Sequence, residues 1–279
     1  MTTWAPDLVV TLLVNAFTTG FFFALRSIRR AIVSNLEPVL GPCGIWERER
    51  RIFRTMHSFA WCYAERYLHL HSPDRFRVDV EGGERLEAIP RGQGLIFVTA
   101  HIGHWETASH VIPAGVDRIA HIVREEELDP QCQAYMYRLL ERHGRARYTT
   151  HFAGDDPGLA VVLAQALRQG HVVGLQGDRP RAGGRSHLST LFGRPMPLPV
   201  GPAALARAAS VSLVPVFSFR TGPRRYRVCV REPILVDAGE DRNAAIREAT
   251  NRLAREIEWA IRQEPHQWYC FHELWPRRS

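Results

Sequence analysis

Short apolar runs alternate with helical stretches along most of the chain. From residue 76 onward the predicted strands are FRVDV at 76–80, GLIFVTA at 94–100, RIAHIV at 118–123, HVVGLQ at 171–176, SLVPVFSF at 212–219 and RYRVCV at 225–230. The predicted helices between them cover residues 81–89, 105–111, 130–143, 157–169 and 202–209. This alternation predicts an α/β fold, in which helices flank a central, mostly parallel or mixed sheet.

The longest stretch without either periodicity covers residues 177–199, which include four prolines and four glycines. Because loops of this length inside a compact domain are more often functional than idle, we interpret it as a functional loop. After it, residues 242–262 have the pattern of an amphipathic helix. The aromatic tail HQWYCFHELWPRRS is predicted to pack back on the body of the protein.

The N-terminal segment is a compositional outlier. Residues 8–25 carry no charge and are followed by Arg26, Arg29 and Arg30. A signal peptide fits poorly, because no basic region precedes the apolar run and no small-residue cleavage pattern follows it. We predict a helix that lies in, or partly inserts into, the membrane interface, with its arginines toward anionic headgroups. A buried core helix is the alternative.

Residues 46–70 form a second amphipathic pattern, whose aromatic side chains are expected in the core. We therefore divide the chain into a membrane-associated helical segment at 1–44 and a single α/β domain at 45–279.

The net charge of the chain indicates an anionic partner. The formal net charge is +7, and all 36 basic residues are arginine. We assign the arginine bias first to genomic base composition, so an arginine indicates phosphate binding only inside a motif. The aromatic and basic residues do not interleave as in nucleic-acid-binding modules, and no nucleic-acid partner is expected. Five scattered cysteines without a Cys-x-x-Cys pair argue against a disulfide framework or a zinc ribbon.

The segment VTAHIGHWET at 98–107 carries the candidate chemistry. His101 follows a predicted strand, and open α/β sheets bind ligands beyond the carboxyl ends of their strands. Side chains five positions apart on one helix diverge by roughly 140°. His101 and Glu106 can therefore meet only if His101 precedes the helix and Gly103 permits a tight bend. A carboxylate placed there would orient the imidazole, which could then activate a hydroxyl as a general base.

Two other interpretations of this segment stay open. His101, His104, Glu106 and His110 could supply metal ligands, but no known metal-binding pattern is complete, so no metal is expected. His101 and Glu106 could also have a purely structural role, while His104 and His110 are interpreted as packing or capping residues. No serine or cysteine is clearly paired with His101, and the G-x-S-x-G motif is absent, which favours direct attack by an acceptor hydroxyl.

The H-x-x-x-x-E arrangement of His101 and Glu106, with IFVTA before it and Gly103 and Trp105 inside it, resembles the signature of the bacterial lipid A biosynthesis (late) acyltransferases. These enzymes belong to the lysophospholipid and glycerolipid acyltransferase superfamily. The resemblance continues in order through IAHIVRE, VVGLQGDRP, LFGRPMPLPVGPAALARAA, Pro215 and HQWYCFHELW. It covers roughly residues 45–275 and is far more specific than the six-residue motif alone.

The resemblance implies a glycerolipid acyltransferase-like domain at the cytoplasmic face of the bacterial inner membrane. A fatty acyl group would pass from an acyl carrier protein or coenzyme A thioester to a lipid or glycolipid hydroxyl, with no other cofactor. His101 would act as the general base and Glu106 as its partner. Arg124, Asp178 and Arg179 would form part of the substrate site, where the arginines would meet phosphate or a developing oxyanion. Their alternative role is an arginine–carboxylate pair that pins the long loop.

The sequence departs from the best-known members of that family at two places. His104 stands where asparagine commonly precedes the tryptophan, and Gly177-Asp178-Arg179-Pro180 replaces an Asp-Gln pattern. Both departures bear on the identity of the acceptor more than on the type of reaction. They fit an enzyme that acylates another glycolipid, a lysolipid or a cluster-specific product. The competing function is a non-catalytic lipid-binding protein on the same fold.

Overall fold

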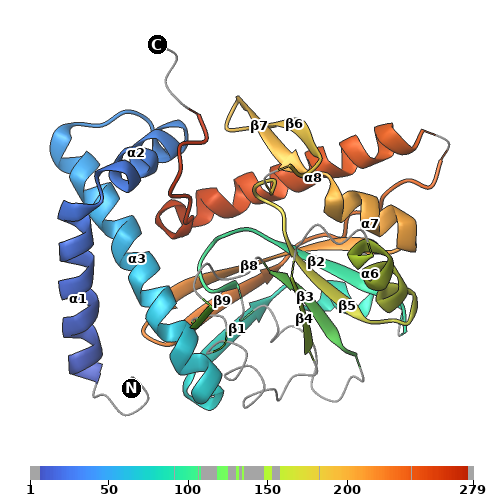
Figure 1. Ribbon diagram of the computed structural model, residues 1–279, viewed down its shortest axis with the longest axis horizontal. Helices are drawn as coiled ribbons and strands as arrows, with labels where there is room; N and C mark the ends of the chain where they lie inside the picture. The colour runs from blue at the N-terminus through green and yellow to red at the C-terminus, as the bar shows by residue number, and fades with distance from the viewer. Residues whose placement is uncertain are drawn as a thin grey trace.

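The computed structural model describes residues 7–90, 92–105, 107, 118–124, 130–131, 134, 148–152, 158–181, 183–239 and 241–275. Its central sheet has seven strands: β1 (Arg77–Glu81), β2 (Leu95–Thr99), β3 (Ala120–Arg124), β4 (Tyr148–Phe152), β5 (Val172–Gln176), β8 (Ser212–Gly222) and β9 (Arg225–Val230). The helices around it are α1 (Asp7–Ala24), α2 (Arg26–Leu40), α3 (Ile45–His71), α4 (Glu84–Glu87), α6 (Leu159–Arg168), α7 (Gly201–Ala209) and α8 (Arg242–Gln263) (Figure 1). The predicted α/β class is confirmed.

The strand order is β1-β9-β8-β2-β5-β3-β4. Every neighbouring pair is parallel except β8 and β9, which form an antiparallel pair. The sheet is therefore mostly parallel, with β1 and β9 running against the other strands. β2 lies between β8 and β5, and its residues 95–98 are all buried, as its continuous apolar run predicts.

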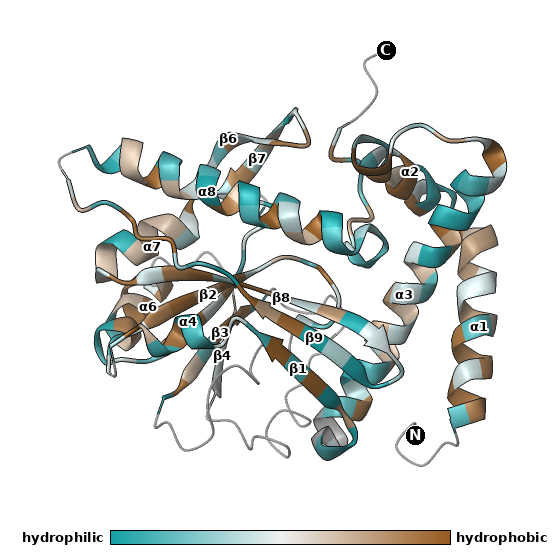
Figure 2. Ribbon diagram, turned by 180° about the vertical axis from the view of Figure 1, so that it is seen from behind, coloured by the Kyte–Doolittle hydropathy of each residue, from teal (hydrophilic) through white to brown (hydrophobic). Residues whose placement is uncertain are grey.

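Each face of the sheet has its own core, because successive side chains of a strand point to opposite faces. Ile96 and Val98 belong to the larger core, which also contains residues of α6, α7 and α8. Leu95 and Phe97 belong to a smaller core on the other face, against which Leu86 of α4 packs. Figure 2 shows α7 and α8 together on one side of the sheet.

The expectation of an irregular loop at 177–199 is wrong for its second half. Residues 186–199 form an antiparallel hairpin of β6 (Ser186–Leu191) and β7 (Arg194–Pro199). The prolines of β7 occupy every second position, so their missing N–H groups all point to the same side, which can face away from β6. The alternating side chains of Met196 and Leu198 are buried in the larger core.

Other elements also differ from the sequence predictions. Strand β4, with the sequence YTTHF, and helix α2 were not predicted. The helix expected at 81–89 is reduced to α4, because Glu81 belongs to β1. The helix expected at 157–169 is confirmed as α6, whereas most of 105–111 and 130–143 lies outside the described residues.

Helix α1 lies beside α3 and buries only Val10, Val14 and Thr18 (Figure 1). Phe22 packs against α2 and α3, whereas most of the other apolar side chains face outward, and those of Leu12 and Phe17 are 59% and 62% exposed. By length and composition α1 is long and apolar enough to cross a membrane. This exposure does not fit the alternative of a buried core helix.

The aromatic tail packs back on the body, as predicted. Trp268, Tyr269, Cys270 and Trp275 are all buried. Asn35 of α2 holds the tail in place: its amide nitrogen donates hydrogen bonds to the carbonyls of Cys270 and His272, and its oxygen accepts one from the Leu274 amide. This fold places the tail across the carboxyl end of β2, where the candidate site lies.

Candidate functional site

The parallel pairing of β2 with β5 brings two polar residues together at one edge of the sheet. Thr99 is in register with Gln176, so His101 and Asp178 each stand two residues beyond the last paired position. The Gly177 amide donates a 2.8 Å hydrogen bond to the Thr99 carbonyl and continues the alignment past the strand ends. This edge is where open α/β sheets bind ligands.

The C-terminal tail fixes the backbone on either side of His101. The amide of Tyr269 donates a 2.8 Å hydrogen bond to the His101 carbonyl. Ile102, which is fully buried, forms an isolated antiparallel bridge with Trp268. The position of the histidine backbone therefore depends on residues far along the chain.

The predicted tight bend at Gly103 is present. Gly103 has a φ of +54°, in the left-handed region that glycine adopts at little cost. A Cβ atom at this position would lie 2.0 Å from the Ser218 carbonyl oxygen, so no side chain fits. The Gly103 amide donates a hydrogen bond to the Gln267 carbonyl at 3.0 Å.

His101 and Asp178 form a hydrogen-bonded pair. Nδ1 of His101 lies 2.7 Å from Oδ1 of Asp178, and the exposed fractions of the two side chains are 28% and 1%. Burial by itself would raise the pKa of the Asp178 carboxyl. The positive charges of His101 and Arg179 and the hydrogen bond from His101 outweigh burial and hold this pKa well below its usual range.

The second oxygen of Asp178 is also occupied. Oδ2 accepts hydrogen bonds from Trp268 Nε1 at 3.3 Å and from the Arg179 guanidinium at 3.3 and 3.4 Å. Arg179 also donates a 3.0 Å hydrogen bond to the Tyr269 carbonyl. Asp178 is thus an ionised, oriented carboxylate beside an imidazole.

The other ring nitrogen of His101 is available for chemistry. Within the described part of the chain, Nε2 has no hydrogen-bond partner, and the Trp105 ring contacts the imidazole edge-on at 5.8 Å. An imidazole whose Nδ1–H is held by a carboxylate can accept a proton at Nε2. The arrangement can therefore deprotonate a hydroxyl placed at Nε2.

The residues predicted from the sequence are only partly brought together. His101, Asp178 and Arg179 meet at the site, whereas Glu106, the expected partner of His101, lies outside the described residues. Among the described residues, Asp178 is the hydrogen-bond partner of His101 Nδ1. The sequence predicted that Asp178 belongs to the site, but not that it contacts His101. Arg124 ends β3, next to β5, and so lies at the same sheet edge. The Arg179–Asp178 pair also fits the alternative role of pinning the start of the long loop.

His104 packs as predicted. It is buried, and its ring makes edge-on contacts with the rings of His69 and Tyr226, each at 5.4 Å. Among the described residues, which include neither Glu106 nor His110, no group of three metal-ligating side chains converges.

Trp268 and Tyr269 also belong to the site, although no sequence pattern predicted their roles there. Trp268 donates to Asp178, and Tyr269 binds both the His101 backbone and Arg179. Their aromatic tail segment was the available signal, but pattern alone does not reveal which sheet edge it covers.

Comparison with curated proteins found no match to this chain. The sequence pattern of the bacterial lipid A biosynthesis acyltransferase family matches residues 3–277. This match spans almost the whole chain, including the segments that carry His101, Asp178 and the C-terminal tail. The protein therefore belongs to the bacterial lipid A biosynthesis acyltransferase family.

Proposed function

We propose that this protein transfers a fatty acyl group from an acyl carrier protein or coenzyme A thioester to a hydroxyl of a membrane lipid or glycolipid. The observation that carries the proposal is the His101–Asp178 hydrogen bond at the sheet edge of a chain from an acyltransferase family. His101 is the general base in this mechanism, and Asp178 is the residue that positions it.

The reaction proceeds by direct attack. Nε2 of His101 takes the proton from the acceptor hydroxyl as its oxygen bonds to the thioester carbonyl carbon, and Asp178 stabilises the resulting imidazolium. The tetrahedral intermediate then breaks its carbon–sulfur bond, and the imidazolium returns the proton to the leaving thiolate. The products are an ester and a free thiol, so atoms and charges balance.

The cysteines near the site favour direct attack over a covalent acyl-enzyme. Burial raises the pKa of the Cys270 thiol to about 11, and burial raises that of the Cys62 thiol to about 12. Thiols with such pKa values carry little thiolate at neutral pH, and thiolate is the nucleophilic form.

The remaining predicted site residues keep their proposed roles. Glu106 keeps the role that the H-x-x-x-x-E motif implies, as the partner of His101. Arg124 and Arg179 supply positive charge for phosphate or for the developing oxyanion. Because Arg179 already binds Asp178 and the Tyr269 carbonyl, its first role is to hold the carboxylate in place.

Membrane association follows from the N-terminal segment at 1–44, with the acyltransferase domain at 45–279. Leu12 and Phe17 of α1 are exposed, and Trp46, in the first turn of α3, is 86% exposed. Arg26 and Arg30 are exposed just after α1, where they can meet anionic headgroups at the cytoplasmic face of the inner membrane. This places the acceptor lipid and the enzyme on the same surface.

An acyl-transfer assay tests the proposal. The full-length protein is incubated with an acyl carrier protein thioester or acyl-CoA and a bacterial lipid extract, and new esters are identified by mass spectrometry. We expect His101→Ala to abolish transfer. The matched control is His171→Ala, which changes a histidine before β5 at the opposite edge of the sheet.

Full activity in His101→Ala would overturn the mechanism. Lipid that co-purifies with the wild-type protein, without product from any thioester, would instead identify a lipid-binding protein on this fold. Lipid profiles of cells with and without the gene would then name the acceptor.

A further inference from the structure

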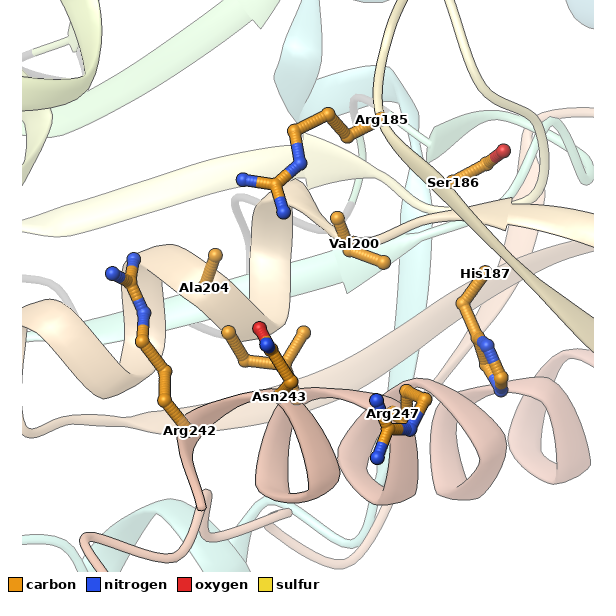
Figure 3. A pocket seen from close by; sticks show the side chains of 9 residues that line it. Arg185, Ser186, His187, Val200, Ala204, Arg242, Asn243 and Arg247 are labelled. Atoms are coloured by element: carbon orange, nitrogen blue, oxygen red, sulfur yellow. The ribbon is translucent and has the colours of Figure 1, made fainter. Parts of the chain in front are cut away.

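A cationic pocket lies apart from His101, between the start of β6, the start of α7 and the first two turns of α8 (Figure 3). Its volume is about 320 Å³, at the lower end of the range for small-ligand sites. Arg185 reaches toward it from the β6 side, and Arg242, Asn243 and Arg247 line it from α8. We call this site the arginine pocket.

Among the described residues, the three arginines of this pocket have no acidic partner. Among the described residues, none of Arg185, Arg242 and Arg247 forms an ion pair or a side-chain hydrogen bond. Further along the same helix, by contrast, Arg255 pairs with Glu248 and Arg262 pairs with Glu258. Three guanidinium groups around one hollow, with no ion pair among the described residues, suit an anion, because each can donate paired hydrogen bonds to phosphate oxygens.

The other lining groups fit the same ligand. Asn243 belongs to the first turn of α8, a 22-residue helix whose N-terminal end favours negative charge. Asp241 already caps this helix by accepting a hydrogen bond from the Ala244 amide, so the arginines rather than the helix end supply the attraction for an anion. Val200 and Ala204 form an apolar wall, which suits the organic part of a phosphate ester better than a free ion.

Contacts made by α8 connect the pocket to the segment that carries Asp178. Its His187 ring and Ser189 of the same strand both hydrogen-bond to Asn251 on α8, at 3.2 and 2.9 Å. Leu253, two residues further along α8, lies against Gly177, which precedes Asp178. Leu253 follows the pocket residue Arg247 by six positions, a rise of about 9 Å along the helix. Helix α8 therefore connects the pocket to the segment that carries Asp178.

We infer that the arginine pocket binds the phosphate group of a substrate and thereby anchors that substrate while its distant end reacts at His101. This inference rests on the proposed function. The phosphate can belong to the headgroup of the acceptor lipid or to the phosphopantetheine arm of the acyl donor, and the two sources share one chemistry. The experiment therefore tests the phosphate site first and its source second.

The first arm is calorimetric titration of the full-length protein with inorganic pyrophosphate. The test variant is Arg185→Gln/Arg242→Gln. The control is Arg75→Gln/Arg225→Gln, which removes the same charge at two exposed arginines outside the pocket. We expect about tenfold weaker binding in the test variant and unchanged binding in the control, because the lost hydrogen bonds are to a charged group.

The second arm compares substrates with and without phosphate. Acyl-phosphopantetheine is compared with acyl-pantetheine as donor, and a phosphorylated glycolipid with its dephosphorylated form as acceptor. The wild-type enzyme should prefer the phosphorylated form of one substrate through a lower KM, and the test variant should lose that preference. The substrate affected identifies the source of the phosphate.

Two results would overturn the inference. One is pyrophosphate binding that is absent in the wild-type protein or equal in the test variant; the other is unchanged discrimination for both substrate pairs. If no thioester is ever consumed, the proposed function fails by itself; in that case loss of pyrophosphate binding in the test variant still supports the phosphate site.

Discussion

Nδ1 of His101 lies 2.7 Å from Oδ1 of Asp178, although 77 residues separate them in the sequence. A buried carboxylate is costly unless it is paired and hydrogen-bonded. Here the cost is offset by His101, by the Arg179 guanidinium and by the Trp268 indole. Replacing the Asp178 carboxylate by an amide removes its negative charge and leaves the His101 imidazole in the chain. Such a variant tests the positioning role of Asp178 separately from proton transfer by His101.

Asp178→Asn should lower kcat for acyl transfer by about 10²-fold, because the imidazolium formed during the reaction loses its counter-charge. KM should change little. Steady-state kinetics measure both parameters. Asp79→Asn, at an exposed acid of β1, is the control, and a kcat for Asp178→Asn equal to that of the control would contradict the role of Asp178.

Gly103→Ala should destabilise the fold by about 2–4 kcal/mol, because it combines a left-handed φ with a backbone clash. Its Cβ would meet the Ser218 carbonyl oxygen at 2.0 Å. Gly193→Ala is the matched control, with a φ of +71° and no atom within 4 Å of its Cβ, so it should cost only about 1–2 kcal/mol. Urea unfolding of both variants measures the difference, and equal losses would show that the bend tolerates a side chain.

Protonation of His266 should weaken the fold in mild acid. Burial, together with Arg54 and Arg51, lowers the pKa of His266 from 6.5 to about 4. Between these two pH values the unfolded chain binds more protons than the folded one, so stability is complete above pH 6.5 and is lost as the pH falls toward 4. Thermal unfolding across this range should show a smaller loss for His266→Gln than for the wild-type protein.

The outward face of α1 should contribute to membrane binding. Leu12→Arg/Phe17→Arg should reduce co-sedimentation with anionic vesicles by at least about tenfold, because two large apolar side chains no longer enter the lipid interface. Val161→Arg/Leu235→Arg adds the same charge at two apolar residues that are 66% and 70% exposed elsewhere. If both double variants bind the vesicles equally, α1 is not the anchoring surface.

Much of the fold could be predicted from local pattern. The apolar run of β2, the β-prone runs of β5, β8 and β9, and the periodicity of α3 and α8 each identify their element, because one buried face or stripe dictates the spacing of apolar residues. Strand β4 and the β6–β7 hairpin were not predicted, because YTTHF is largely polar and the prolines of β7 normally indicate a loop. What stabilises the hairpin is burial of Met196 and Leu198 beneath it, which no local pattern shows.

By itself the sequence determined that His101 follows a buried strand and that Asp178 belongs to a second polar segment after another strand. It also determined an uncharged N-terminal helix followed by arginines. Only the tertiary structure decided that β2 and β5 are neighbours in register, that the C-terminal tail closes over them, and that Arg185, just before β6, and two arginines of α8 surround one pocket. The physical reason is that periodicity records how each segment meets the core, whereas contacts between distant segments depend on strand order and register.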